Sequence, residues 1–377
     1  MEALLIIAVA CASLSCSVKS DWWWEYEEGI RHYSKEALSK EFPDKTRPVS
    51  FKHPVFQCPD MTPSPSVPSS EFVKAADIKV IAALGDSLTT AIGANATTVL
   101  GIPIEFRHVS WSIGGYGTFQ DVITLAILKL FNPNLLGASP GKTIHGMHAH
   151  ISDTGFNLAV TGHNTNLPGQ TRELIDTLRG YEGLNFEKDW KLLTILMGMN
   201  DICDYCKDKA LYSVDNFIHY MTLSLEMLLN EPRMIVNVVQ ILPMHTLREV
   251  QKPTPGCLLQ SFCSCLIEPV SRSPELQELV EVNLEFQKRL EKLLYSDRFF
   301  REDFAVVLQP FLKHADPPRL PNGKIDMTFF THDCFHFTIK GHEELAKGLW
   351  NNMFQPDGGK VIVSSFSEPI SLNCPPS

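Results

Sequence analysis

The chain has 377 residues, of which 44% are hydrophobic and 20% are charged. This balance is typical of a folded globular protein and excludes an intrinsically disordered or collagen-like chain. The formal net charge is -10 and no basic stripe stands out, which argues against binding to a nucleic acid. Length alone would favour two domains, at roughly 150 residues for each.

Residues 1–17 have the pattern of a secretory signal peptide. The apolar run Ala3–Leu14 is too short to cross a bilayer, which needs about 20 residues, and small residues suited to cleavage follow it. Glu2 departs from the usual basic start, and the alternative is a buried first helix. Later segments are interrupted by polar residues before they reach bilayer length. We therefore expect a secreted, extracellular protein without a stable membrane anchor.

Residues 18–70 form an N-terminal segment of two parts. Tyr26–Phe42 has the pattern of a short amphipathic helix, and the Pro/Ser-rich stretch 43–70 is expected to run extended over a surface. At the other end, Ser, Glu and Pro break up residues 361–377, which we interpret as a C-terminal tail.

Between residues 71 and 360, strand patterns alternate with helix patterns. Apolar and β-branched runs predict buried strands at Ile78–Leu84, Trp190–Met197, Arg233–Leu242 and Phe304–Gln309. Helical spacing of apolar residues predicts helices at Gln170–Arg179, Val214–Leu229, Pro274–Tyr295 and Gly341–Met353. This alternation predicts an α/β fold in three layers, α/β/α, with a parallel sheet covered on both faces.

The cysteines are interpreted through the predicted secretion. Cleavage after Ser17 leaves eight of them, an even number that favours disulfides in an oxidising compartment and leaves their pairing open. They are Cys58, Cys203, Cys206, Cys257, Cys263, Cys265, Cys334 and Cys374. The same compartment makes the sequon Asn95-Ala96-Thr97 a candidate glycosylation site at Asn95.

Two groups of side chains are candidates for a metal site. A zinc site would combine Cys203-x-x-Cys206 with Cys263-x-Cys265, whose second spacing does not fit the usual four-cysteine pattern. The other group, in a polar connection without a nearby carboxylate, is His145, His148 and His150. We expect disulfides in the first case and an exposed loop in the second, and therefore no metal.

Two further patterns imitate known sites. Gly137–Gly141 fits the G-x-S-x-G elbow around Ser139, but the next residue, Pro140, has no N–H to give to an oxyanion hole. Gly137–Thr143 is one residue short of a phosphate-binding loop. Ser139 is therefore expected to be an ordinary loop serine.

Four short blocks occur in a fixed order along the chain. They are Gly-Asp-Ser-Leu at 85–88, Asn-Leu-Ala-Val-Thr-Gly at 157–162, Gly-Met-Asn-Asp at 198–201 and Asp-Cys-Phe-His at 333–336. The first and third directly follow predicted strands, where open α/β sheets bind their ligands. This arrangement resembles the GDSL, or SGNH, hydrolase family. The strings at 82–88, 111–115, 156–160, 200–206 and 333–337 resemble its membrane-associated phospholipase B branch.

The resemblance covers residues 43–360 and implies a single hydrolase domain, which we place at 71–360, with a flavodoxin-like parallel sheet. One active site that needs both Ser87 and His336 must use most of the chain, which overrules the two-domain expectation. Chemistry agrees, because a serine hydroxyl needs an adjacent base and an imidazole titrates near neutrality. Asp333 can reach round a turn to orient His336.

The resemblance also assigns the oxyanion hole. Its donors would be the backbone N–H groups of Ser87 and Gly162 and the side-chain amide of Asn200, which donates without carrying a charge. Three positions depart from the family pattern. Tyr116 replaces an acid, Thr161 a proline and His163 a small residue.

We expect an esterase that releases fatty acids from phospholipids and lysophospholipids through an acyl-serine intermediate, without a metal or organic cofactor. The lipid would be met as micelles or dispersed lipid. One alternative is an esterase of the same fold that acts on carbohydrate or simple esters, and another is a non-catalytic lipid-binding protein.

We expect the segment 111–155 to supply an apolar wall for the acyl chain. Ordinary core packing is the equal alternative for these side chains. They are Trp111, Phe119, Leu125, Ile127 and Leu128.

Overall fold

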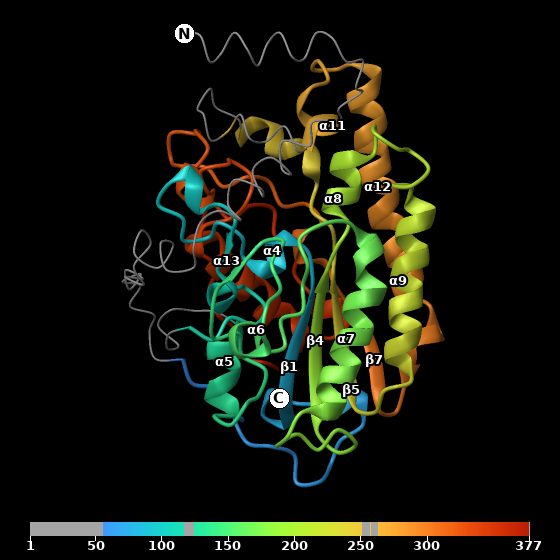
Figure 1. Cartoon of the computed structure of the whole chain (residues 1–377). Coiled ribbons are helices and arrows are strands. Elements are labelled where there is room, and N and C mark those ends of the chain that lie inside the picture. Colours follow the sequence, from blue (N-terminus) through green and yellow to red (C-terminus); the bar gives the residue numbers. More distant parts are fainter. Residues whose placement is uncertain (1–55, 117–123, 251–256, 258–262, 377) are drawn as a thin grey trace.

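The computed structural model describes residues 56–116, 124–250, 257 and 263–376 (Figure 1). The predicted signal peptide at 1–17 and the predicted helix Tyr26–Phe42 lie outside the described residues. The first described segment is fixed to the body of the protein, since Ser64 donates hydrogen bonds from its N–H and hydroxyl to the Asp77 carboxylate.

A five-stranded sheet forms the centre of the molecule. Four strands are parallel and lie in the order β1 (Ile78–Gly85), β4 (Trp190–Leu196), β5 (Met234–Val239) and β7 (Phe304–Gln309). The short strand β6 (Phe300–Arg301) pairs antiparallel with β7 at the edge. Every residue of β4 and β5 is buried, as expected for parallel strands between two helical layers. The sequence predicted all four parallel strands.

In the described part of the chain, five longer helices cover the two faces of the sheet. They are α5 (Thr124–Phe131), α7 (Leu167–Gly180), α9 (Val214–Leu229), α12 (Pro274–Leu294) and α13 (Ile339–Met353). Helix α9 packs against α7 and α12 on one side, whereas α5 and α13 pack together on the other (Figure 1). Ser273 caps α12 by accepting a hydrogen bond from the N–H of Leu276, and Pro274 supplies its first turn. The predicted α/β/α layering is confirmed.

The remaining helices and strands of the described chain are short. The one-turn or two-turn helices are α4 (Ser87–Thr90), α6 (Ile151–Thr154), α8 (Met199–Asp204) and α11 (Ser264–Ile267), and β2 (Ile104–Glu105) pairs antiparallel with β3 (Thr143–Ile144). The 3-10 helices are Ser70–Phe72, Ala75–Asp77, Val99–Gly101, Arg107–Val109, Asn164–Asn166, Met244–Val250, Asp297–Phe299, Pro310–Leu312, Met327–Phe329 and Asp357–Gly359.

The eight cysteines that follow residue 17 form four disulfides. Two of these bonds join α8 and the turn after it to the segment around α11, so the zinc interpretation of the same four cysteines is excluded. The bonds are Cys58–Cys374, Cys203–Cys263, Cys206–Cys265 and Cys257–Cys334. The preference for disulfides over zinc is therefore confirmed.

The tail beyond residue 360 packs on the body of the protein. The N–H of Val363 donates to the carbonyl of Phe311, and the indole N–H of Trp350 donates to the carbonyl of Asn373. Within the described ranges, no helix combines the length and the apolar character that a bilayer crossing demands.

Candidate active site

Ser87 lies at the carboxyl end of β1, where the strand turns into the short helix α4. Asp86 caps this helix, since its Oδ1 accepts a hydrogen bond from the N–H of Leu88. The turn requires glycine at position 85, because its φ is +153° and a Cβ there would lie 2.6 Å from the carbonyl oxygen of Leu196. The strand and the cap together fix the direction of the Ser87 hydroxyl.

The structure brings Ser87, His336 and Asp333 into one hydrogen-bonded chain. Nε2 of His336 is 2.8 Å from Oγ of Ser87, and Nδ1 of His336 is 2.6 Å from Oδ2 of Asp333. All three residues are buried. An imidazole that donates from Nδ1 to the carboxylate must accept at Nε2 the hydrogen bond that the serine hydroxyl donates. This is the arrangement that activates a serine nucleophile.

The turn at 331–336 holds Asp333 as a carboxylate. Its Oδ1 accepts hydrogen bonds from the N–H groups of Phe335 and His336 and from the hydroxyl of Thr331. Burial alone would raise the pKa of Asp333, but the neighbouring imidazole of His336 and these hydrogen bonds lower it to about 2. The carboxylate is therefore ionised throughout the neutral range. Cys334 occupies the left-handed region in the middle of this turn, with φ +58°.

The three expected oxyanion donors come from three separate segments. Asn200 is the second residue of α8, shortly after β4, and its side-chain amide donates a 2.8 Å hydrogen bond to the carbonyl of Gly162. The second N–H of that amide is left for another acceptor. Among the hydrogen bonds within the described ranges, none uses the backbone N–H of Ser87 or Gly162. Gly162 has φ +140°, a conformation that favours glycine.

Two buried carboxyl groups adjoin this site, and the sequence analysis gave neither a role. Oδ2 of Asp86 has no hydrogen-bond partner within the described part of the chain, and burial raises the pKa of Asp86 to about 7. Asp201 accepts a hydrogen bond from the N–H of Asn164, and burial raises its pKa to about 6. Their positions directly before Ser87 and directly after Asn200 were the signal in the sequence.

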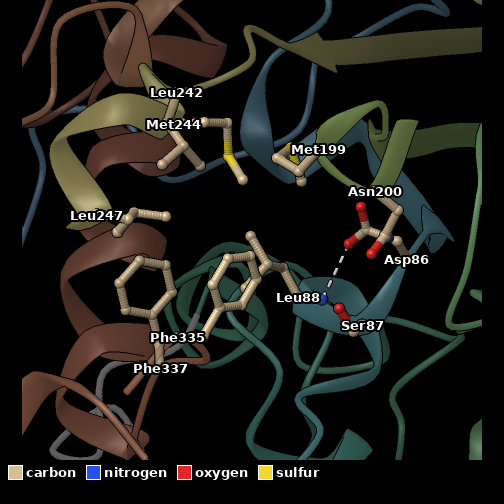
Figure 2. Close-up of a pocket in the computed structure, with 10 residues that line it drawn as sticks. All are labelled: Asp86, Ser87, Leu88, Met199, Asn200, Leu242, Met244, Leu247, Phe335 and Phe337. Atoms are coloured by element: carbon tan, nitrogen blue, oxygen red, sulfur yellow. Dashed lines mark hydrogen bonds between the residues drawn. The ribbon is translucent and has the colours of Figure 1, made fainter. Parts of the chain in front are cut away.

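A small pocket beside Ser87 opens to solvent. Its polar end is formed by Asp86, Ser87 and Asn200 (Figure 2). The rest of its wall is apolar, and consists of Leu88, Met199, Leu242, Met244, Leu247, Phe335 and Phe337. The site thus places the hydrogen-bonded Ser87 hydroxyl beside a mostly apolar wall.

Among its described residues, the segment 111–155 contributes none to the lining of this cavity. Trp111, Ile127 and Leu128 are buried in the main core, with the Trp111 ring packed edge-on against Phe311 at 6.4 Å. The core-packing alternative is therefore confirmed for these three, and their assignment to an acyl wall is wrong. Phe119 and the side chain of Leu125 lie outside the described residues.

The remaining sequence candidates are structural. Ser139 is a buried loop serine whose hydroxyl donates to the carbonyl of Thr154. His148 and His150 are exposed as expected, whereas His145 is not, because its Nδ1 lies 3.8 Å from the buried carboxylate of Glu105. Within the described ranges no three His, Cys, Asp or Glu side chains are grouped to hold a metal ion.

A buried ion pair, which the sequence did not reveal, supports the segment that leads to Gly162. Arg107 contacts Glu105 at 2.7 Å and donates to the carbonyl oxygens of Asn157 and Ala159. Burial opposes ionisation of Glu105, but Arg107 and the hydrogen bonds from its neighbours lower its pKa to about 2. In the sequence, this ion pair was indicated only by the two charged residues, Glu105 and Arg107, within the mostly apolar stretch 102–109.

The fold and the site define a serine hydrolase of the GDSL type. Residues 81–349 match the family model of the GDSL-like Lipase/Acylhydrolase family, and the chain belongs to this family. Among named proteins, it is 41% identical over 331 residues to phospholipase B1, membrane-associated, of Homo sapiens, and 40% identical to the same protein of Mus musculus. Each match covers 85% of this chain but only 22% of the relative, so the chain spans about a fifth of those proteins.

Proposed function

We propose that this protein hydrolyses fatty acyl esters of phospholipids and lysophospholipids through an acyl-Ser87 intermediate. One observation carries the proposal. The hydrogen-bonded chain of Ser87, His336 and Asp333 lies at the polar end of a cavity whose other walls are apolar. An esterase of fatty acids needs both features at one place, because the ester carbonyl must reach the serine while the acyl chain leaves water.

The reaction follows from the positions of the named groups. His336 Nε2 takes the proton of the Ser87 hydroxyl as Oγ attacks the ester carbonyl carbon, and the carbonyl oxygen becomes an oxyanion. The N–H groups of Ser87 and Gly162 and the amide of Asn200 stabilise it. The carbon–oxygen bond to the alcohol then breaks, and the protonated His336 gives its proton to the leaving oxygen.

Deacylation repeats these steps with water. His336 removes a proton from the water molecule as its oxygen attacks the acyl carbon. The bond from that carbon to Ser87 Oγ then breaks, which releases the fatty acid, and protonated His336 returns its proton to Oγ. Asp333 stays ionised and holds the imidazole in the required tautomer at both stages. Protein side chains and backbone groups supply every proton transfer and every oxyanion contact in this sequence.

The apolar wall favours a lipid substrate over the alternatives. An acetyl group or a sugar would leave Leu247, Phe335 and Phe337 facing water in the cavity, whereas a fatty acyl chain would cover them. The names of the phospholipase B1 relatives support the same substrate class. A lipid-binding protein without activity would not need a serine aligned at 2.8 Å with a histidine.

We also propose that the protein acts outside the cell, with Asn95 glycosylated. Its four disulfides support this, because they persist in oxidising compartments. With a net charge of -10, attraction to anionic bilayers is weak, which favours substrate presented as micelles or dispersed lipid.

Two measurements on purified protein test the activity. A fluorophosphonate probe is expected to label Ser87, and long-chain lysophosphatidylcholine is expected to be hydrolysed faster than acetyl esters. Ser87→Ala should abolish both reactions, while Ser139→Ala, the control, should retain both. Labelling at Ser139, or turnover of acetylated sugars with no fatty acid released from the lysolipid, would contradict the proposal.

A further inference from the structure

Gly162 lies between two side chains that each hydrogen-bond to a carboxylate from a different part of the fold. The Thr161 hydroxyl donates to Oε1 of Glu105 at 3.2 Å, and Nε2 of His163 is 2.8 Å from Oδ2 of Asp204. Both residues depart from the family pattern noted in the sequence. The two departures therefore share one feature, an anchor directly beside the glycine of the oxyanion hole.

The anchor of Thr161 is rigid. Glu105 is 4% exposed, and its other oxygen, Oε2, is held by Arg107 at 2.7 Å and by the hydroxyl of Thr143 at 2.6 Å. Arg107 also binds the carbonyl of Ala159, two residues before Thr161. A carboxylate fixed by so many partners gives the Thr161 hydroxyl one direction in which to donate.

The anchor of His163 belongs to α8, the helix that carries Asn200. The imidazole of His163 also packs on the ring of Tyr212, with 4.5 Å between the ring centroids. From the same helix, Asp201 accepts the N–H of Asn164, and Asn200 donates to the carbonyl of Gly162. Three side chains of α8 thus bind three consecutive residues of the loop.

Helix α8 is itself fixed. Two disulfides tie it to the segment of α11. Cys203, within α8, is bonded to Cys263, and Cys206, just after α8, is bonded to Cys265. Movement of the loop relative to Asn200 would break hydrogen bonds to a helix that cannot follow it.

We propose that Thr161 and His163 are positioning residues that clamp Gly162 so that its backbone N–H points at the oxyanion. This inference rests on the proposed function. A glycine at φ +140° has no side chain to restrict it, so the direction of its N–H depends on the residues at its two sides. The clamp matters most in the transition state, because the oxyanion, unlike the ester carbonyl, carries a full negative charge.

Isosteric substitutions test each side of the clamp. Thr161→Val removes only the hydroxyl, and His163→Phe keeps a ring for Tyr212 but loses the hydrogen bond to Asp204. Each is expected to lower kcat about 10-fold, and the double variant about 10²-fold, the order seen when one oxyanion donor is lost. KM for lysophosphatidylcholine should change less than about twofold, and fluorophosphonate labelling should slow in parallel with kcat.

Rescue and control variants separate positioning from general stability. Thr161→Ser and His163→Gln retain donors and should recover most of kcat. His219→Phe, which changes an exposed histidine beside Tyr220 on α9, should leave kcat unchanged. Thermal unfolding identifies any variant whose activity falls through loss of structure.

The two proposals fail in different ways. If Ser87→Ala abolishes turnover while Thr161→Val and His163→Phe keep the wild-type kcat, the clamp is wrong and the proposed function stands. A rise in KM at constant kcat also contradicts the clamp, since it would place these residues in substrate binding. If Ser87→Ala retains turnover, the proposed function itself is wrong.

Discussion

The disulfide between Cys257 and Cys334 ties a distant segment to the turn that carries Asp333 and His336. Cys334 directly follows Asp333 and precedes His336 by two residues, and it adopts φ +58°, a conformation that costs a non-glycine residue about 1 kcal/mol or more. Its N–H donates to the carbonyl of Thr331, so the disulfide and the turn hold the same residue from two sides. We therefore expect this covalent bond to affect catalysis as well as stability.

Loss of this disulfide is expected to lower activity directly. The double variant Cys257→Ser/Cys334→Ser should lose at least about 10-fold in kcat, because small displacements of a catalytic group have large effects on rate. The matched control, Cys58→Ser/Cys374→Ser, removes the bond between the two ends of the described chain and should lower the melting temperature with kcat preserved. Wild-type protein should lose activity in strong reductant, and alkylation of Cys334 in unreduced, active enzyme would contradict the assignment.

Asn200 is expected to act in the transition state. Asn200→Ala removes the side-chain donor and its bond to the carbonyl of Gly162, so kcat should fall by about 10² to 10³ with little change in KM. Steady-state kinetics on lysophosphatidylcholine measure both constants. A large rise in KM at constant kcat would show that Asn200 binds substrate instead.

The sequence was sufficient for the features that depend on local pattern. Helix α9 begins and ends where the apolar spacing predicted, at Val214 and Leu229, because a buried stripe and the Ser213 cap both act within one helix. Ser87, His336 and Asp333 were predicted from the four ordered blocks that carry the family resemblance, and the structure brings them into one hydrogen-bonded chain. Asp333 and His336 are three residues apart, and Ser87 follows a strand whose apolar run marks its end.

The sequence pattern could not predict features that segments far apart in the chain form together. The apolar wall of the cavity combines Leu242 and Leu247, which follow β5, with Phe335 and Phe337, which follow β7. Apolar residues in such connections look the same whether they fill a core or line a cavity. The contact between His145 and Glu105 likewise joins residues with no spacing rule between them, so the exposed loop expected for His145 was wrong.

The two buried acids near the site make stability depend on pH in a predictable direction. The pKa of Asp86 rises from 3.8 to about 7 on folding, and that of Asp201 to about 6. A raised pKa means that the folded state holds protons more tightly than the unfolded state. Their contribution to the free energy of unfolding is therefore complete below pH 4 and is lost as pH rises towards 7.

Asp86→Asn tests this dependence, since the neutral amide keeps an acceptor for the N–H of Leu88. The free energy of unfolding, measured in urea from pH 4 to pH 8, should fall less steeply with pH than in the wild type. Asp176→Asn, at an exposed position on α7, controls for the loss of one negative charge. Equal slopes in the wild type and Asp86→Asn would show that Asp86 titrates alike in both states.

The far wall of the cavity is expected to set the length of acyl chain that the protein accepts. Leu247 lies on the 3-10 helix Met244–Val250, across the cavity from Ser87 and beside Phe337 (Figure 2). Leu247→Trp would fill that end and exclude several methylenes, each worth about 0.8 kcal/mol when buried. Loss of two or three methylenes corresponds to a fall of about 10- to 50-fold in kcat/KM for long-chain lysophosphatidylcholine, with short-chain esters little affected.

A chain-length series on three variants decides the point. Leu247→Ala opens the same end and should shift the preference towards longer or bulkier chains, which protects the test against simple misfolding of the tryptophan variant. Leu284→Trp places the same side chain at an exposed position of α12 and should leave the profile unchanged. Only an acyl chain long enough to contact residue 247 is affected by the size of its side chain. If Leu247→Trp lowers kcat/KM equally at every chain length while its melting temperature is retained, the acyl chain therefore lies elsewhere.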